Sequence, residues 1–338
     1  MKRIIAVSLL GAMLLSLAAC GEDKKPAVTT AGTTAATVTP VTTAPETVAP
    51  ETTVITTEAT TAEEITTTTT AETTTTAATT TTAATTPAPV VTTPRPSDYP
   101  ALNYTREELE AMDNTKSGWG QGVHVDALNR PTACTNWQNK YGQYGAIYIM
   151  PEDDPARLTF DLGYEYGCTG RILDTLKEKG VVGTFFITMY YAKSCPELVQ
   201  RMVDEGHIVA NHSVNHLSMP DLSVADMEAE IMGLHNYVKE NFGYEMFLFR
   251  PPMGEHSPRA LAVAQNLGYK SVLWSYTYLD YDTANQKPVD EAYAICTKNA
   301  HKGAVYLLHG VSETNTAILG DLIDYLRDSG IGVANSWE

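Results

Sequence analysis

The chain has 338 residues and a formal net charge of −17 at pH 7, with 23 Lys and Arg against 40 Asp and Glu. A surface of this sign repels phosphate backbones and anionic lipid headgroups, so the composition argues against a nucleic acid partner. A neutral or amino-bearing glycan is compatible with it.

Residues 1–20 have the pattern of a bacterial export signal. They begin with Lys2 and Arg3, continue with an apolar run too short for an ordinary transmembrane helix, and end in small residues. LAAC at residues 17–20 resembles a lipobox, in which Cys20 is lipidated and becomes the mature N-terminus. We therefore expect a lipoprotein signal peptide and an extracytoplasmic protein held at the cell membrane by its lipid. A plain secretory signal is the alternative.

Residues 21–97 are dominated by Thr, Ala, Val and Pro with scattered Glu, and they contain no aromatic residue. Without helical or strand periodicity, this segment buries too little apolar area to offset the entropy of ordering, which predicts a disordered linker. Thr-rich segments with Pro resemble O-glycosylated stalks. A flexible coil of this length spans roughly 45–50 Å on average. It would therefore let a domain act within the cell wall while its anchor stays in the membrane.

The rest of the chain predicts one α/β domain. Residues 98–156 look irregular apart from a short helix at YTREELEAM, and we expect them to be a lead-in packed on a barrel. From Arg157 onward, about seven apolar strands alternate with helices, which favours a parallel sheet. Polar residues at many strand ends suit a distorted, TIM-like (β/α)-barrel over residues 157–338 better than an open doubly wound sheet. Helices are expected near residues 169–179, 196–206, 223–241, 258–267, 289–300 and 316–329, and a last strand at 330–336.

The cysteines of this domain give little information about its fold. They lack the CxxC spacing of a zinc ribbon, and export permits disulfides, of which we expect at most one. No basic patch or long amphipathic seam indicates an oligomer, so a monomer is expected. The four residues are Cys134, Cys168, Cys195 and Cys296.

Six polar residues stand at or just after the ends of the apolar runs. An unpaired charge inside a covered sheet costs several kcal/mol, so such residues are tolerated where a strand emerges. Strands that deliver acids, bases and metal-type ligands at one end would build one pocket, which points to an enzyme. The six are Asp161, His212, His216, Arg250, Asp280 and His309.

Each of these residue types has a chemical use. His212 and His216 are four apart, and on one helical turn they would face the same way and share a metal ion. The alternative is two loop histidines bonded to backbone. Asp161 suits a general base, and Arg250 would hold that carboxylate ionised by a charge-assisted hydrogen bond.

Two further residues complete the acid–base set. Asp280 would orient Arg250, with a purely structural ion pair as the alternative. His309 suits a general acid because both of its protonation states are accessible near neutral pH. A base, an acid and a Lewis-acid site around one water serve the hydrolysis of an amide or ester. Neither Ser213 nor Ser275 has the context of a serine nucleophile.

The ordered motifs LTFD, NHSVNH, FRPP, WSYTYLDY and YLLH resemble the polysaccharide deacetylase family, the NodB-homology domain of carbohydrate esterase family 4, over residues 157–338. Those enzymes are metal-dependent de-N-acetylases or de-O-acetylases on distorted barrels. The likeness is greatest to the subgroup that deacetylates muramic acid in peptidoglycan on the way to the δ-lactam. GWGQG, NRPTA and YGAIYI extend it back to about Ser117.

The resemblance implies a role for each residue of the site. Asp161 becomes the catalytic base, tuned by Arg250 with support from Asp280, and His309 becomes the acid. His212 and His216 become ligands of a divalent cation such as Zn²⁺, with Ser213 bracing their loop. The implied substrate-binding residues are Leu307, Met253 and Tyr281.

The chain departs from the family pattern at Leu162, which stands where the wider family has a metal-binding aspartate. This change puts the metal in doubt more than the catalysis, since the muramic subgroup commonly lacks that aspartate too. Glu165 is the nearest acidic substitute. Met253 replaces a family tyrosine, a change of small cost if the backbone N–H there contacts the oxyanion.

These features predict a hydrolase that removes N-acetyl groups from peptidoglycan amino sugars, most of all N-acetylmuramic acid. One alternative is an O-acetyl esterase acting on xylan or wall polysaccharide with the same residues. The other, motivated by Leu162, is a non-catalytic glycan-binding module. Asp161, Arg250 and His309 together argue against the module, because a binding surface has no need of all three.

Overall fold

The computed structural model describes residues 104–337. The expected signal peptide, Cys20 and the Thr-rich linker lie outside these residues. In the part of the chain that is described, no helix has both the length and the apolar character needed to cross a membrane.

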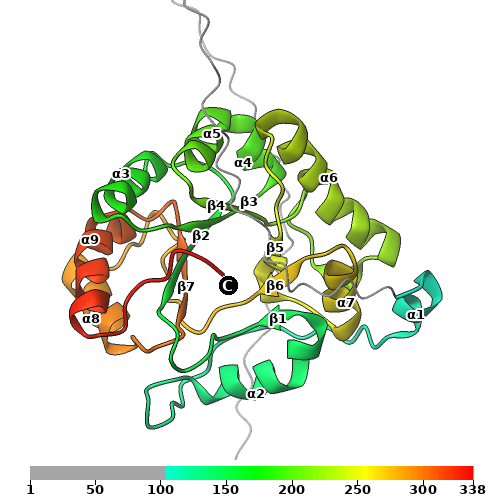
Figure 1. Cartoon of the computed structure of the whole chain (residues 1–338), viewed down its shortest axis with the longest axis horizontal. Helices are drawn as coiled ribbons and strands as arrows, with labels where there is room; N and C mark the ends of the chain where they lie inside the picture. The colour runs from blue at the N-terminus through cyan, green and yellow to red at the C-terminus, as the bar shows by residue number, and fades with distance from the viewer. Residues whose placement is uncertain (1–103, 338) are drawn as a thin grey trace, which may run out of the picture. The chain divides into compact units, whose positions relative to one another are not determined.

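Seven parallel strands form a single curled sheet (Figure 1). Their spatial order is β1-β6-β5-β4-β3-β2-β7. Because neighbouring strands pair in parallel, the carboxyl ends of all strands lie on the same rim of the sheet. The strands are β1 Ala146–Ile147, β2 Arg157–Leu162, β3 Thr184–Ile187, β4 Ile208–Asn211, β5 Leu248–Phe249, β6 Lys270–Val272 and β7 Val305–His309.

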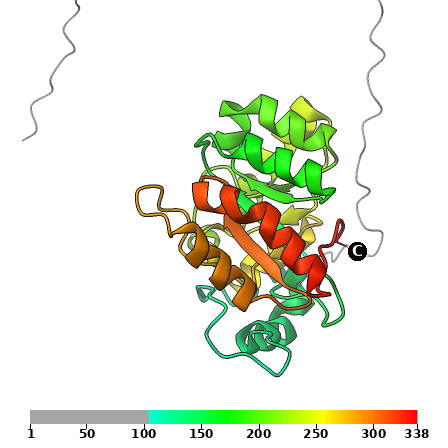
Figure 2. The same ribbon diagram turned by 90° about the vertical axis from the view of Figure 1, so that its left-hand side faces the viewer.

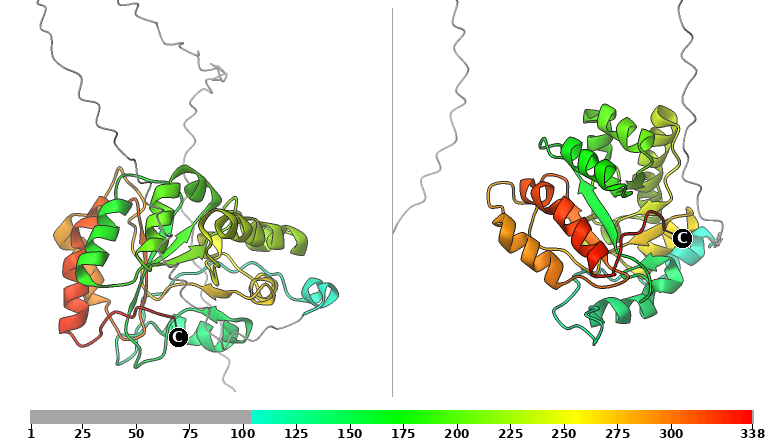
Figure 3. Two further views of the ribbon diagram at one scale, coloured as in Figure 1. Left: turned by 45° about the horizontal axis from the view of Figure 1, so that its top comes forward. Right: turned by 60° about the vertical axis from the view of Figure 1, so that its left-hand side comes forward.

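Helices cover the outside of the curl, with α8 and α9 side by side next to β7 (Figures 1, 2 and 3). Their starts and stops follow local rules. Ser223 accepts a hydrogen bond from Asp226 N and begins α6, and Gly243, with φ of 65°, ends it. The helices are α1 Arg106–Ala111, α2 Thr132–Tyr141, α3 Thr169–Lys179, α4 Met189–Ser194, α5 Pro196–Asp204, α6 Val224–Phe242, α7 Pro258–Asn266, α8 Val289–Lys298 and α9 Glu313–Asp328.

The curl is a half-barrel, because the edge strands β1 and β7 do not pair in the described structure. The chain leaving β6 bridges part of this opening. Ser275 N donates to Val305 O at 3.0 Å, and Leu307 N donates to Tyr276 O at 2.9 Å. The expected distorted (β/α)-barrel of about seven strands is thereby confirmed.

The lead-in is more regular than its sequence indicates. It contains α2 and the two-residue strand β1, which pairs in parallel with β6 through Ala146 and Ser271. It also supplies Trp119 and Tyr148 to a buried aromatic cluster with Trp274. The strand expected at residues 330–336 is reduced to one bridge between Ala156 and Val333, so that prediction is wrong.

The four cysteines of the domain are buried and free, with no disulfide among them. The Sγ of Cys134 lies 3.8 Å from Trp274 O, and burial raises the pKa of this thiol to about 12. A thiol with so high a pKa holds little reactive thiolate near neutral pH, which suits a packing role.

Candidate active site

Strand register brings the functional residues together. In the ladder between β2 and β7, Asp161 and His309 are direct partners. In the next part of the sheet, Asn211 of β4 pairs with Phe249 of β5, which sets His212 beside Arg250 at the next position. Residues that follow paired strands by the same offset necessarily meet at the rim of a parallel sheet.

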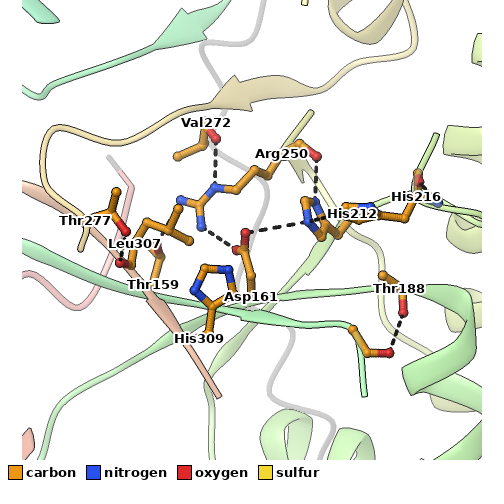
Figure 4. Close-up of polar contacts among 12 residues, drawn as sticks. Thr159, Asp161, Thr188, His212, His216, Arg250, Val272, Thr277, Leu307 and His309 are labelled. Carbon is orange, nitrogen blue, oxygen red and sulfur yellow. Dashed lines mark hydrogen bonds and ion pairs between the residues drawn. The ribbon is translucent and has the colours of Figure 1, made fainter. Parts of the chain in front are cut away.

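A buried ion pair lies at the centre of this rim. The Arg250 Nη1 donates to Asp161 Oδ1 at 2.5 Å (Figure 4). The rest of the guanidinium is also held, since Nη2 donates to Thr159 Oγ1 at 2.8 Å and Nε donates to Val272 O at 3.0 Å. The Arg250 guanidinium lies 4.0 Å from the ring centroid of Phe186. These contacts fix the guanidinium, so it can orient the carboxylate rigidly.

This environment keeps Asp161 ionised. Burial by itself raises the pKa of the carboxyl, but the charge of Arg250 opposes it, with smaller contributions from His212 and His309. The net result is a pKa below the ordinary value of 3.8. A carboxylate that stays charged and still faces a cavity can accept a proton from water.

His212 presents one nitrogen lone pair to the site. Its Nδ1 lies 2.8 Å from Arg250 O, and because a carbonyl only accepts, this nitrogen carries the proton. Its Nε2 lies 3.6 Å from Asp161 Oδ2 and 3.2 Å from His216 Nε2. Burial lowers the pKa of His212 to about 4 and also lowers that of His216. Both imidazoles are therefore neutral at pH 7.

The spacing of the two histidines predicted a helical turn, but they lie on a loop. Ser213 and His216 have φ values of 70° and 55°, so both adopt a left-handed conformation that a helix would not allow. The Ser213 hydroxyl accepts from His216 N at 2.9 Å, and Glu230 of α6 accepts from Asn215 N at 2.7 Å. These hydrogen bonds within the loop and to α6 hold the loop in place, and the loop conformation brings the two rings together without a helix.

His309 is held by Asp280, and here the sequence prediction is corrected. Asp280 was expected to orient Arg250, but its Oδ1 lies 2.6 Å from His309 Nδ1 and its Oδ2 accepts from His309 N at 2.8 Å. Asn315 Nδ2 donates to the same Oδ2 at 2.5 Å. The reason is the path of the chain after β6, which crosses to β7 and carries Asp280 with it.

Asp280 also sets the charge of the imidazole. Burial lowers the pKa of His309, but the hydrogen bond and the charge of Asp280 outweigh it, and the net pKa lies above 6.5. With Nδ1 bound to Asp280, Nε2 is the nitrogen left to act on a substrate. In Figure 4 the His309 ring lies beside the Asp161 carboxylate. The site thus sets an ionised carboxylate next to an imidazole whose protonated form is stabilised.

These groups open into a cavity of about 630 Å³. Leu307, buried to 4% exposure, forms an apolar wall, while Met253 and Tyr281 are exposed at the mouth. The ring of Tyr281 lies 5.3 Å from that of His309. The cavity also takes in residues that the sequence argument did not single out, although most of them lie within the runs it quoted. They are Pro251, Gly254, Trp274, Thr277, Tyr278 and Leu279.

Comparison with known proteins identifies the family. The polysaccharide deacetylase profile matches residues 150–272. PdaA of Bacillus subtilis, a peptidoglycan-N-acetylmuramic acid deacetylase, is 37% identical over 225 residues, which are 66% of this chain and 85% of that protein. The chain belongs to the polysaccharide deacetylase family. The resemblance seen in the motifs is confirmed, and this deacetylase is by family a hydrolase.

Other relatives agree with this assignment. The solved structure of Bacillus subtilis PdaA, a family 4 carbohydrate esterase, superposes with a TM-score of 0.62 at 36% identity, covering 66% of this chain and 94% of that one. An uncharacterized 30.6 kDa protein of Geobacillus stearothermophilus is 41% identical over 59% of this chain and 76% of its own length. A peptidoglycan-N-acetylglucosamine deacetylase of Bacillus cereus is 32% identical over 51% of this chain and 82% of its own length.

Members of this family typically use a metal, and the two loop histidines fit one. Their Nε2 atoms converge within 3.2 Å, both rings are held neutral by burial, and neutral imidazole is the form that binds a cation. Among residues 104–337 no group of three or more His, Cys, Asp or Glu offers a larger ligand set. His212 and His216 would therefore hold the divalent cation.

Glu165 is not a substitute for the aspartate missing at Leu162. Its carboxylate accepts from Gly167 N at 2.6 Å, Thr169 Oγ1 at 2.5 Å and Tyr191 OH at 2.9 Å. It is therefore committed to the start of α3. Leu162 itself is fully buried in the core.

Proposed function

We propose that this deacetylase hydrolyses the N-acetyl group of peptidoglycan amino sugars, with N-acetylmuramic acid as its preferred substrate. The observation that carries the proposal is the pairing of Asp161 with His309 across the β2–β7 ladder, facing a cavity with an apolar wall. Relatives named for peptidoglycan deacetylation, at 37% and 32% identity, support the choice of glycan.

The residues divide the reaction between them. Asp161 takes a proton from water as the water oxygen attacks the carbonyl carbon of the acetyl group. His309 gives the proton of Nε2 to the amide nitrogen, so that the C–N bond breaks into acetate and a free amine. Leu307 and Trp274 would contact the acetyl methyl. A divalent cation held by His212 and His216 would supply Lewis acidity toward the amide carbonyl.

Asp280 and Arg250 act through their neighbours. Asp280 accepts the Nδ1 proton of His309, which orients the ring as in an acid–base triad. Its charge also favours the imidazolium form, which carries a second proton on Nε2, toward the cavity. Arg250 keeps Asp161 charged and fixed. A carboxylate held ionised beside an imidazole whose protonated form is stabilised suits amide hydrolysis, because one can accept a proton and the other can donate one.

The test is acetate release from peptide-free glycan strands, from N-acetylglucosamine polymers and from acetylated xylan, each with added divalent cation. We expect acetate and a free amine from the peptide-free strands, located on the muramic sugar by mass spectrometry. Release from acetylated xylan alone would indicate the O-acetyl esterase. Binding without release from any substrate would indicate the non-catalytic module.

We also propose that the protein works outside the cytoplasm, tethered to the membrane by a lipid on Cys20 while the linker lets the domain reach the wall. The lipobox-like LAAC sequence and the composition of residues 21–97 support this. Labelled fatty acid should be incorporated by the native chain and lost in Cys20→Ser. Equal labelling of both would contradict the lipid anchor.

A further inference from the structure

A second hollow lies beside the catalytic cavity on the same rim of the sheet. It measures about 370 Å³, and His216 lines both. Its other walls come from the segments that follow β2, β3 and β4. The catalytic cavity is lined largely by the segments that follow β5 and β6 and by residues of β7 itself. The second hollow therefore extends the catalytic cavity along the rim, with His216 between the two.

Two tyrosines stand exposed over this second hollow. Tyr164 and Tyr190 have 46% and 66% of their surface accessible. A tyrosine offers a flat apolar ring with a polar end, which matches the apolar face and edge hydroxyls of a pyranose. The catalytic mechanism uses neither residue, and neither ring is needed to fill the core.

Local structure holds the backbone around both tyrosines. Tyr190 lies in the first turn of α4, whose cap Thr188 accepts from Tyr191 N at 3.2 Å. Tyr164 is followed directly by Glu165, whose carboxylate is fixed at the start of α3. A backbone held in this way loses little freedom when a ligand binds.

The lining of the second hollow contains no lysine or arginine. Nothing in it would attract an anionic group such as a phosphate. The chemistry matches a neutral sugar. In an alternating glycan strand, the neighbour of an N-acetylmuramic acid residue is the uncharged N-acetylglucosamine.

We propose that the hollow beneath Tyr164 and Tyr190 is a subsite for the neutral sugar next to the one that is deacetylated. The inference rests on the proposed function for the position of the target sugar. It assigns these two tyrosines to recognition of the glycan strand, beyond the single sugar that reacts.

The test compares ligands of two lengths in an inactive background. His309→Ala suits this purpose better than a change at Asp161, because it leaves the buried Arg250 paired. We expect Tyr164→Ala and Tyr190→Ala each to raise the Kd of a peptide-free tetrasaccharide by about tenfold, the scale of one lost aromatic contact. The Kd of the single N-acetylated amino sugar should not change.

Tyr166→Ala is the matched control, since Tyr166 is 50% exposed in the same segment but does not line the hollow. It should leave both dissociation constants unchanged. An unchanged tetrasaccharide Kd in both test variants overturns the subsite. Equal weakening of the short and the long ligand also overturns it, because the rings would then act through the catalytic cavity.

The two proposals fail in different ways. A tetrasaccharide that binds through the tyrosines but releases no acetate from the active chain would support the subsite and contradict the deacetylation. Acetate release that is equally fast with Tyr164→Ala and Tyr190→Ala on long strands would support the deacetylation and contradict the subsite.

Discussion

Asp161 and Asp280 are two buried carboxylates of one site, 8% and 1% exposed, and they differ in their partners. Asp161 faces the cationic Arg250 and keeps an edge on the cavity. Asp280 lies behind His309 and receives hydrogen bonds from His309 and Asn315. A carboxylate with an edge on the cavity can take a proton from water, whereas one enclosed by donors can only orient its neighbours. The surroundings, and not the residue type, decide which is the base.

The largest expected effect tests the difference directly. Asp161→Asn keeps the shape of the side chain and removes the base, so acetate release should fall about 10²- to 10⁴-fold while the glycan still binds. Asp174→Asn, at an exposed carboxylate of α3, is the control and should behave as the native chain. A loss below about tenfold would remove Asp161 from the role of base.

The next effect concerns the ion pair. Arg250→Met leaves the Asp161 charge buried without its partner, which should lower the free energy of unfolding by about 3–5 kcal/mol. Urea denaturation at pH 7 measures this loss. Asp161→Asn/Arg250→Met should recover part of it, because no unpaired charge remains. If the double variant is as unstable as the sum of the single ones, the pair is not coupled as the structure indicates.

Asp280→Asn should act on the pH profile. Asp280 holds the pKa of His309 above 6.5, so the native rate falls only as pH rises through that raised value. Without the carboxylate charge the pKa falls, and the alkaline limb of kcat/KM should move to lower pH, with about 10- to 100-fold less activity near neutrality. Asp282→Asn, an exposed neighbour, should leave the limb in place. An unshifted limb in Asp280→Asn would show that His309 is not the acid.

The smallest effect concerns the outer part of the Asp280 network. The Tyr278 hydroxyl donates to Asn315 Oδ1 at 2.5 Å, and Asn315 in turn holds Asp280. Tyr278→Phe should lower the free energy of unfolding by about 1 kcal/mol and the rate only a few-fold. Tyr325→Phe serves as the comparison. A loss as large as that of Asp280→Asn would mean that Tyr278 touches the substrate directly.

The central acid–base pair was within reach of sequence reasoning. Asp161 and His309 each end an apolar run, and parallel strands deliver their ends to one rim, so their meeting follows from periodicity and topology alone. Arg250 was found by the same rule. The side-chain partners of these residues were less accessible, because a partner depends on the direction of a loop, which no local pattern specifies.

Three differences illustrate this limit. The spacing of His212 and His216 suggested a helical turn, but two left-handed residues bring the rings together instead. Glu165 lies near the site in sequence, yet it is bound to the start of α3. Strand β1 has only two residues, too few to show a period, and tertiary pairing with β6 defines it.

The sequence by itself determined the alternation of strands and helices and the position of charged residues at the ends of strands. An unpaired charge buried anywhere else along a strand would cost several kcal/mol. The tertiary structure alone decided that Asp280 serves His309 and not Arg250, and that a second hollow continues the catalytic one. Ladder register is fixed by repeating backbone bonds, whereas the path of a loop depends on packing between segments far apart in the chain.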